Sequence, residues 1–177
     1  AWSDTKGSSV LARRKRRIGP QAKTFNFEWP SQQKPLTGLS DILETTAADE
    51  RYFLDESQTG ELIEKLDAKG FRDKIVPYRT CIDDTQGFDG VRLYNNESPT
   101  LRSSRSGLKI ATSVDPLTVR RITPREYLRL QSFPEGVYER LKAAGITDSQ
   151  IYSIAGNAVT VNVIEAIGVR LLPYLAD

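Results

Sequence analysis

Residues 120–134 read RRITPREYLRLQSFP, and this stretch decides how the C-terminal third of the chain begins to fold. Thr123 is a strong N-cap, because its hydroxyl can accept a backbone N–H from the first helical turn. Pro124 suits the first helical position, and Glu126, three residues after the cap, completes a capping box. Pro134 ends the pattern. The stretch therefore predicts a short helix that begins at Pro124.

Two further helices are expected downstream. Residues 150–159 read QIYSIAGNAV, which favours a short helix around Ser149 to Ser153. The last helix places apolar side chains at intervals of four, at Val159, Val163, Ile167 and Leu171. If the last three have no partner within the chain, they form an exposed apolar stripe that needs another domain.

Upstream of residue 120, one helix is followed by short extended pieces. Leu62, Ile63 and Leu66 share a helical face that Ser57 or Thr59 can cap and Gly70 can stop. A single helical turn capped by Ser40 is expected at residues 39–43. Strands are expected at residues 75–76, 91–94 and 108–110, between turn signals. The fold class predicted is α+β, with a small irregular β-rich module.

Composition and charge distribution limit the function. The chain has 177 residues, 38% hydrophobic and 27% charged, which is typical of a globular protein. Net charge is only +2, yet bases dominate residues 1–30 and 92–129 while acids dominate residues 41–69. A polyanion partner is therefore expected at the basic segments. No apolar run approaches the roughly 18 residues of a membrane span, so no membrane partner is expected.

Cysteine and histidine usage excludes several kinds of chemistry. The chain has no histidine and one cysteine, Cys81, so an internal disulfide is excluded. The common zinc sites need several such ligands, so neither a zinc site nor another metal site is expected. His-based acid–base catalysis is excluded as well. Asp83 and Asp84 follow Cys81 closely and should raise its pKa. We therefore interpret Cys81 as a structural thiol, compatible with a reducing cytoplasm.

Taken together, residues 120–134 and 150–159 resemble the ninth and tenth motifs of the DNA cytosine-5 methyltransferases. These motifs are written R-x-L-T-P-R-E-x-x-R-L-Q-G-F-P and Q-x-Y-x-x-x-G-N-[SA]-V. Gln86–Tyr94 and Ser98–Leu101 are similar to the family's target recognition domain, which shows a Q-G-x-R-[VI]-Y stretch and then a P-T-L turn.

The resemblance implies an organisation in three parts. Residues 1–45 would be a basic N-terminal segment and linker from a catalytic domain, and residues 46–119 the target recognition domain. Residues 120–177 would be helices that return to, and complete, a Rossmann-like methyltransferase domain. The basic run Arg13–Arg17 fits a flexible tail, a phosphate contact or a degenerate strand of the eighth motif.

The family's reacting residues are missing from the sequence. The nucleophile is the cysteine of a Pro-Cys-Gln loop, which attacks a flipped-out cytosine, and a Glu-Asn-Val glutamate assists. Neither loop occurs here, nor does the Phe-x-Gly-x-Gly cofactor turn. No catalytic residue is therefore expected in this chain. The resemblance implies double-stranded DNA, S-adenosylmethionine and a catalytic domain or subunit as partners.

DNA contacts are expected on the loop after the P-T-L turn. Arg102 and Arg105 are the best candidates for reading bases, because arginine bonds guanine through two atoms. Hydroxyls nearby can hold phosphates or base edges, at Thr100, Ser103 and Ser104. Arg92 and Tyr94 either reach DNA or pack beneath the loop. The alternative is a merely solvated loop.

Cofactor contacts are expected at Gly156, Asn157, Ala158 and Val159. The resemblance places this turn beside S-adenosylmethionine, with Gly156 allowing a tight turn, although a simple helix N-terminus is the alternative. Ala158 stands where many relatives have serine, so only backbone contact is expected there.

Charged residues of the ninth motif are expected to organise the domains. Arg121, Arg125 and Glu126 resemble residues that brace the recognition domain against the catalytic one. Arg125 and Arg129 lie four residues apart on the helix and are candidates to pair with Glu126 or with groups across that interface.

Two readings of the whole chain remain open. In the first, it is part or a subunit of a methyltransferase of bacterial or phage origin, cytoplasmic and active only with its catalytic half. In the second, it is a catalytically inactive DNA-binding or regulatory module derived from such an enzyme.

Overall fold

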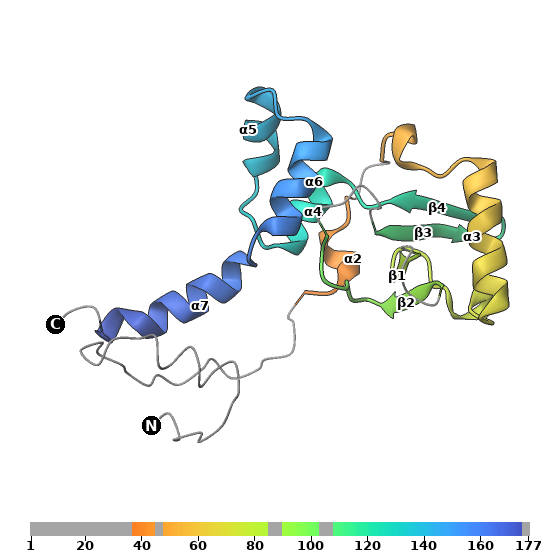
Figure 1. Ribbon diagram of the computed structural model, residues 1–177, viewed down its shortest axis with the longest axis horizontal. Coiled ribbons are helices and arrows are strands. Elements are labelled where there is room, and N and C mark those ends of the chain that lie inside the picture. Colours follow the sequence, from red (N-terminus) through yellow and green to blue (C-terminus); the bar gives the residue numbers. More distant parts are fainter. Residues whose placement is uncertain (1–36, 45–47, 85–89, 103–107, 175–177) are drawn as a thin grey trace, which may run out of the picture. The chain divides into compact units, whose positions relative to one another are not determined.

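The computed structural model describes residues 37–44, 48–84, 90–102 and 108–174. The basic run Arg13–Arg17 therefore lies outside the described residues. Residues 33–164 form one compact unit, and residues 165–174 lie outside it. The chain is an α+β protein, as the sequence predicts (Figure 1).

The centre of the compact unit is a four-stranded antiparallel sheet with strand order β2-β1-β3-β4 (Figure 1). Its strands are β1 (Thr80–Asp83), β2 (Arg92–Asn95), β3 (Lys109–Val114) and β4 (Leu117–Arg121). The expected strand at residues 75–76 is wrong, because Ile75 follows a short 3-10 helix, η2 (Arg72–Lys74). The sequence pattern also missed β1, which is too short for alternation to stand out.

Alternating side chains of the sheet build two separate cores. Cys81 of β1 pairs with Ile110 of β3, and both side chains are fully buried on one face. Ile82, Ala111 and Val119 are buried on the other face. This is the period-two alternation of a sheet covered on both sides, and it explains why Cys81 is a core residue.

Helix α3 (Glu56–Ala68) covers the second face through Leu62 and Leu66. Its N-cap is Asp55, whose side chain accepts from the Gln58 amide at 2.8 Å, so the expected cap at Ser57 or Thr59 is wrong. The helix ends as expected, because Gly70 adopts the left-handed conformation at φ +61° that glycine permits.

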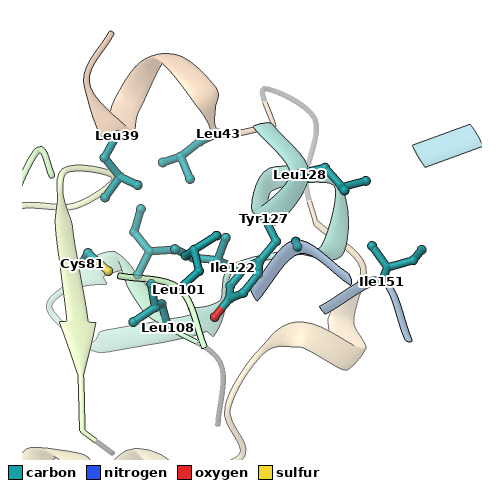
Figure 2. Close-up of a cluster of buried hydrophobic side chains, with 11 residues drawn as sticks. Leu39, Leu43, Cys81, Leu101, Leu108, Ile122, Tyr127, Leu128 and Ile151 are labelled. Atoms are coloured by element: carbon teal, nitrogen blue, oxygen red, sulfur yellow. The ribbon is translucent and has the colours of Figure 1, made fainter. Parts of the chain in front are cut away.

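Helices α2 (Leu39–Ile42), α4 (Pro124–Leu130) and α6 (Asp148–Asn157) supply the other core. Figure 2 shows Leu39 and Leu43 on one side of this cluster and the Tyr127 ring at its centre. The Tyr127 ring meets that of Tyr152 edge to face, with centroids 4.8 Å apart. The Tyr152 hydroxyl donates to the Ile122 carbonyl at 2.7 Å, which satisfies its polar end.

Both halves of the predicted capping box on α4 are present. The Thr123 hydroxyl accepts from the Glu126 amide at 3.2 Å, and the Glu126 carboxylate accepts from the Thr123 amide at 2.7 Å. At the other end, the amides of Ser132 and Phe133 donate to Arg129 and Leu128 carbonyls, which is a Schellman cap. The sequence stretch that begins the C-terminal third thus forms a helix closed at both ends.

The Schellman cap predicts the effect of one substitution. Ser132 has φ +58°, and the family pattern has glycine at this position. Ser132→Gly should therefore raise the free energy of unfolding by about 0.5–1 kcal/mol. The left-handed conformation costs a residue with a side chain roughly 1–2 kcal/mol, which glycine avoids. Part of this gain is lost because glycine gives the unfolded chain more conformational entropy. Urea denaturation measures the change. Ser153→Gly, inside α6, is the control and should destabilise the protein.

Three other elements differ from expectation. The turn of α2 is capped by Gly38, not Ser40, and a Cβ at Gly38 would collide with the Asn96 side chain. Strand β4 and helix α5 (Val137–Ala143) were not anticipated. The remaining short elements are 3-10 helices, η1 (Glu50–Tyr52) and η3 (Leu172–Tyr174).

The C-terminal helical region carries an apolar stretch. Residues Asp148–Tyr174 are apolar enough, by length and composition alone, to cross a membrane, contrary to the sequence expectation. The backbone argues against that interpretation, because α6 and α7 (Val161–Leu171) have 10 and 11 residues and Ala158 between them is extended. A spanning helix needs about 20 continuous residues.

Candidate nucleic-acid interface and cofactor turn

One end of the sheet gathers cationic side chains from three segments. Strand β1 ends at Asp83, which lies opposite Arg92 of β2. The Arg102 guanidinium approaches the Asp83 carboxylate to 3.5 Å. On the other neighbouring strand, the Lys109 ammonium pairs with Asp84. Three cations and two carboxylates therefore meet where β1 leaves the sheet.

Of the predicted DNA contacts, Arg92 and Arg102 lie at this end. Arg92 is exposed, whereas Tyr94 is half-buried and packs against the α2–α4–α6 core. Thr100 is exposed and Leu101 is buried, so Leu101 anchors the chain just before Arg102. The other three predicted contacts lie outside the described residues, namely Ser103, Ser104 and Arg105.

The predicted cofactor turn has a different geometry from the one expected. Gly156 and Asn157 form the last turn of α6, and Ala158 is its C-cap. The turn is therefore a helix C-terminus, not a helix N-terminus, and Gly156 is helical. Val159 belongs to the extended connection before α7, and its side chain is 60% exposed. Asn157 is exposed as well, so this segment presents an open edge.

Gln131 holds the predicted cofactor turn in place. Its amide nitrogen donates to the Ala155 carbonyl at 2.9 Å, and its amide oxygen accepts from the Thr160 hydroxyl at 2.7 Å. Its backbone carbonyl also accepts from the Val161 amide at 3.0 Å. One buried side chain thus fixes both ends of the connection between α6 and α7. The sequence analysis missed this residue, although a glutamine just after a helix is a candidate for such bonds.

A cleft of about 290 Å³ is lined by Thr100, a predicted DNA contact, but by none of the four predicted cofactor residues. Thr100 and Leu101 lie on the side of the P-T-L turn, while Gln131 and Thr160 lie on the side of the α6–α7 connection. The structure therefore places the segment before Arg102 beside Gln131, whose side chain bonds the residues on either side of the predicted cofactor turn.

The charged residues of the ninth motif pair differently from the expectation. Arg120, and not Arg125 or Arg129, binds Glu126, through two hydrogen bonds of 2.8 and 2.9 Å. Arg120 and Glu126 are 2% and 0% exposed, so this is a fully buried ion pair. Burial alone would lower the pKa of Arg120, but the hydrogen bonds and charge of Glu126 outweigh it and raise that pKa. Glu126 also accepts from the Glu44 amide at 2.9 Å.

The other two arginines of α4 are engaged with nearby acids. Arg125 forms ion pairs with Glu44 at 3.2 Å and Glu139 at 2.5 Å, and it stacks on the Tyr138 ring. Arg129 bonds Glu135 at 2.8 Å. These pairs join α4 to the α2 segment and to α5 within the compact unit.

A polar network attaches η1 to α6. The Tyr52 hydroxyl donates to the Asp148 carboxylate at 2.9 Å, and Lys142 donates to the same carboxylate at 2.9 Å. Burial and the bond to Asp148 raise the pKa of Tyr52. Burial alone would raise the pKa of Asp148, but the bonds from Lys142 and Tyr52 outweigh it and hold that pKa below its usual value of 3.8.

The network predicts a dependence of stability on pH. Because the folded pKa of Asp148 is depressed, its contribution is present above about pH 4 and is lost as pH falls through the folded pKa. Asp148→Asn should therefore lower the free energy of unfolding near neutral pH, and the difference from the unchanged protein should shrink towards pH 2. Urea denaturation across this range measures it, with Glu61→Gln on the exposed face of α3 as the control. A difference that is constant with pH would contradict the prediction.

Cys81 has the environment of a structural thiol. Its side chain is fully buried, and burial, followed by the charge of Asp83, raises its pKa to about 12. A thiol with that pKa is protonated at neutral pH and is not an activated nucleophile. Among the described residues, no group of three or more metal-ligating side chains is found.

A sheet end rich in arginine and lysine is a feature of nucleic-acid-binding proteins. The comparison with known families is specific: the chain belongs to the C-5 cytosine-specific DNA methylase family, whose model matches residues 9–172.

Relatives of known name agree with this assignment. The chain is 29% identical over 220 residues to the orphan methyltransferase M.SPBetaI of Bacillus phage SPbeta, covering 94% of this chain and 49% of the relative. It is 29% identical over 160 residues to the type II methyltransferase M.SsoII of Shigella sonnei, covering 85% and 36%. The chain spans about half the length, or less, of these curated relatives.

A solved structure shares the fold. The crystal structure of S. pombe Dnmt2 methyltransferase matches with a TM-score of 0.50 and 19% identity, covering 81% of this chain and 44% of that one. At this identity the likeness concerns the fold alone.

Proposed function

We propose that this chain is the DNA-recognising and cofactor-completing portion of a site-specific DNA cytosine-5 methyltransferase. The whole enzyme would transfer a methyl group from S-adenosylmethionine to C5 of a flipped cytosine in double-stranded DNA. One observation carries the proposal: the family match runs from residue 9 to residue 172, while the Pro-Cys-Gln and Glu-Asn-Val segments are not in the sequence. The catalytic residues would then come from another segment or subunit.

The sheet end supports the DNA-binding role. Cations from β2, β3 and the segment after Leu101 lie together there, which suits a duplex that carries a negative charge on every phosphate. Arg102, like Arg92, has the chemistry to bond guanine through two atoms. In this proposal residues 46–119 act as the target recognition domain, and Arg105, Ser103 and Ser104 extend the contact.

The turn at residues 156–159 fits one edge of a cofactor site. Its exposed backbone can hydrogen-bond a ligand, but it offers no charged or aromatic side chain. Most of an S-adenosylmethionine pocket would therefore come from the catalytic half. When bound, the cofactor supplies the methyl group, and the role of this chain is to hold the turn through Gln131.

The exposed apolar side chains of helix α7 support the proposal that this chain binds a catalytic half. None of its described side chains is buried, although the helix is rich in valine, leucine and isoleucine. Val163 and Ile164 are 49% and 53% exposed. Ile167 and Leu171 are half-buried, so the expected apolar stripe is most open at its first turn. In this proposal residues 120–177 return to a Rossmann-like catalytic domain and complete it, and residues 1–45 are the basic N-terminal segment and linker that come from that domain.

The relatives support a proposal for the cellular location of the protein. They belong to bacteria and their phages, so we propose a cytoplasmic, DNA-associated protein that needs neither a membrane nor a metal ion. A catalytically inactive DNA-binding or regulatory module is the second candidate, and the sheet end would serve it equally well.

The DNA-binding part of the proposal can be tested on this chain. Repeated selection from a pool of randomised duplexes should enrich a short sequence. Arg102→Ala should then reduce the preference for that sequence over a scrambled duplex by roughly tenfold, because a bidentate arginine–guanine contact is worth about 1–3 kcal/mol. Fluorescence anisotropy measures both affinities. Selection that enriches no sequence would contradict the proposal, and Arg140→Ala on α5 is the control.

A further inference from the structure

Asp83 is an unusual residue for the end of a central strand. Its side chain is 6% exposed, and its strand neighbours Cys81 and Ile82 are apolar core residues. A buried carboxylate is costly unless a cation or several donors compensate it. Arg102 approaches it to 3.5 Å, and Arg92 lies opposite it across the β1–β2 ladder. Arg102 and Arg92 are the nearby cations that compensate this charge.

Arg102 is held from two sides. Leu101, which precedes it, is 8% exposed and fixes the backbone in the core. Its side chain is 37% exposed, and its guanidinium meets Asp83 through one terminal nitrogen. A guanidinium has five N–H donors in a rigid plane. This single contact restrains the guanidinium and leaves its other N–H donors for two further bonds to a guanine edge.

We propose that Asp83 is a positioning residue for sequence discrimination: it holds Arg102 in the orientation that reads a base. The inference rests on the proposed function, in which Arg102 contacts DNA. Without Asp83, the long side chain of Arg102 samples many rotamers and binds any nearby phosphate. When Asp83 is present, its carboxylate reduces non-specific binding in two ways: it fixes the arginine, and it repels the DNA backbone.

The neighbouring residue supplies a matched control. Asp84 carries the same charge one position further along, but its partner is Lys109 of β3. Asp84→Asn and Asp83→Asn remove one negative charge each from the same sheet end. Both should raise affinity for an unrelated duplex by a similar factor. Only Asp83→Asn should alter the base preference that depends on Arg102.

The test uses the selected duplex, a scrambled duplex and duplexes with single base-pair changes. Asp83→Asn should strengthen binding to the scrambled duplex and reduce discrimination by roughly tenfold, at the same base pair that Arg102→Ala affects. The double variant Asp83→Asn/Arg102→Ala should discriminate no less than Arg102→Ala alone. A merely structural loss would instead weaken binding to both duplexes alike.

The possible failures are distinguishable. If selection enriches no sequence, the proposed function itself fails. If Arg102→Ala loses the preference while Asp83→Asn keeps it, only the positioning role of Asp83 is overturned. If Asp83→Asn does not fold, as judged by circular dichroism, Asp83→Glu keeps the charge and displaces the arginine. Unchanged discrimination in Asp83→Glu would overturn the inference as well.

Discussion

Replacing Glu126 by alanine should lower the free energy of unfolding by about 3–5 kcal/mol, because it leaves the buried Arg120 guanidinium without its partner. The loss is large for this residue, since Glu126 also accepts from the Thr123 and Glu44 amides. Four donors would lose their acceptor at once. Urea denaturation monitored by circular dichroism measures the change.

A control variant distinguishes the cost of leaving one buried charge unpaired from the contribution of the ion pair as a whole. Arg120→Leu/Glu126→Leu removes both charges and should recover part of the loss, because apolar replacement of a buried pair is often close to neutral. Glu135→Ala breaks the exposed pair with Arg129 and should cost less than about 1 kcal/mol. A loss below about 1 kcal/mol for Glu126→Ala would show that the buried pair does not organise this region.

The second large effect is expected at α7. Val163→Asp/Ile164→Asp should reduce affinity for the catalytic half by at least about a hundredfold, because an unpaired charge buried at an interface costs several kcal/mol. The two side chains are about half exposed in this chain, so its own stability should change little. Isothermal titration calorimetry with the polypeptide that carries the Pro-Cys-Gln segment measures the affinity.

A matched substitution on the same helix checks the specificity of this effect. Glu165→Gln removes the charge of an exposed α7 residue without adding one, and should leave the affinity within a few-fold. Equal losses for both variants would indicate that the helix is generally perturbed. Unchanged affinity in the double aspartate variant would mean that the first turn of α7 does not meet the catalytic half.

Local chemistry made parts of the fold predictable from sequence. The capping box of Thr123 and Glu126 depends on residues three positions apart, and the structure confirms it. Gly70 likewise ends α3 as its local conformation requires. Strands β1 and β4 were not predictable in this way, because their stability comes from partners distant in the sequence and their length is only 4 and 5 residues.

The candidate site likewise has some features that the sequence predicted and others that it did not. The segments that bear the predicted DNA contacts and cofactor turn were identified by their resemblance to a family. Asp83 and Gln131, which contact these segments, were not, and neither was Arg120, the partner of Glu126. Each acts through a contact set by tertiary structure, 3.5 Å from Arg102 in the case of Asp83, and residue type alone does not reveal such contacts. The family pattern also drew attention to Arg121 and Arg125, whereas geometry selects Arg120 as the partner of Glu126.

The central claim is that this chain supplies recognition while another part supplies the chemistry. The most direct measurement is transfer of tritiated methyl groups from S-adenosylmethionine to DNA by this chain, by the polypeptide encoded immediately upstream, and by the two mixed. We expect the upstream polypeptide to carry the Pro-Cys-Gln and Glu-Asn-Val segments, and methyl transfer to occur in the mixture and in neither part alone. Methyl transfer by this chain alone, or a mixture no more active than its parts, would contradict the account.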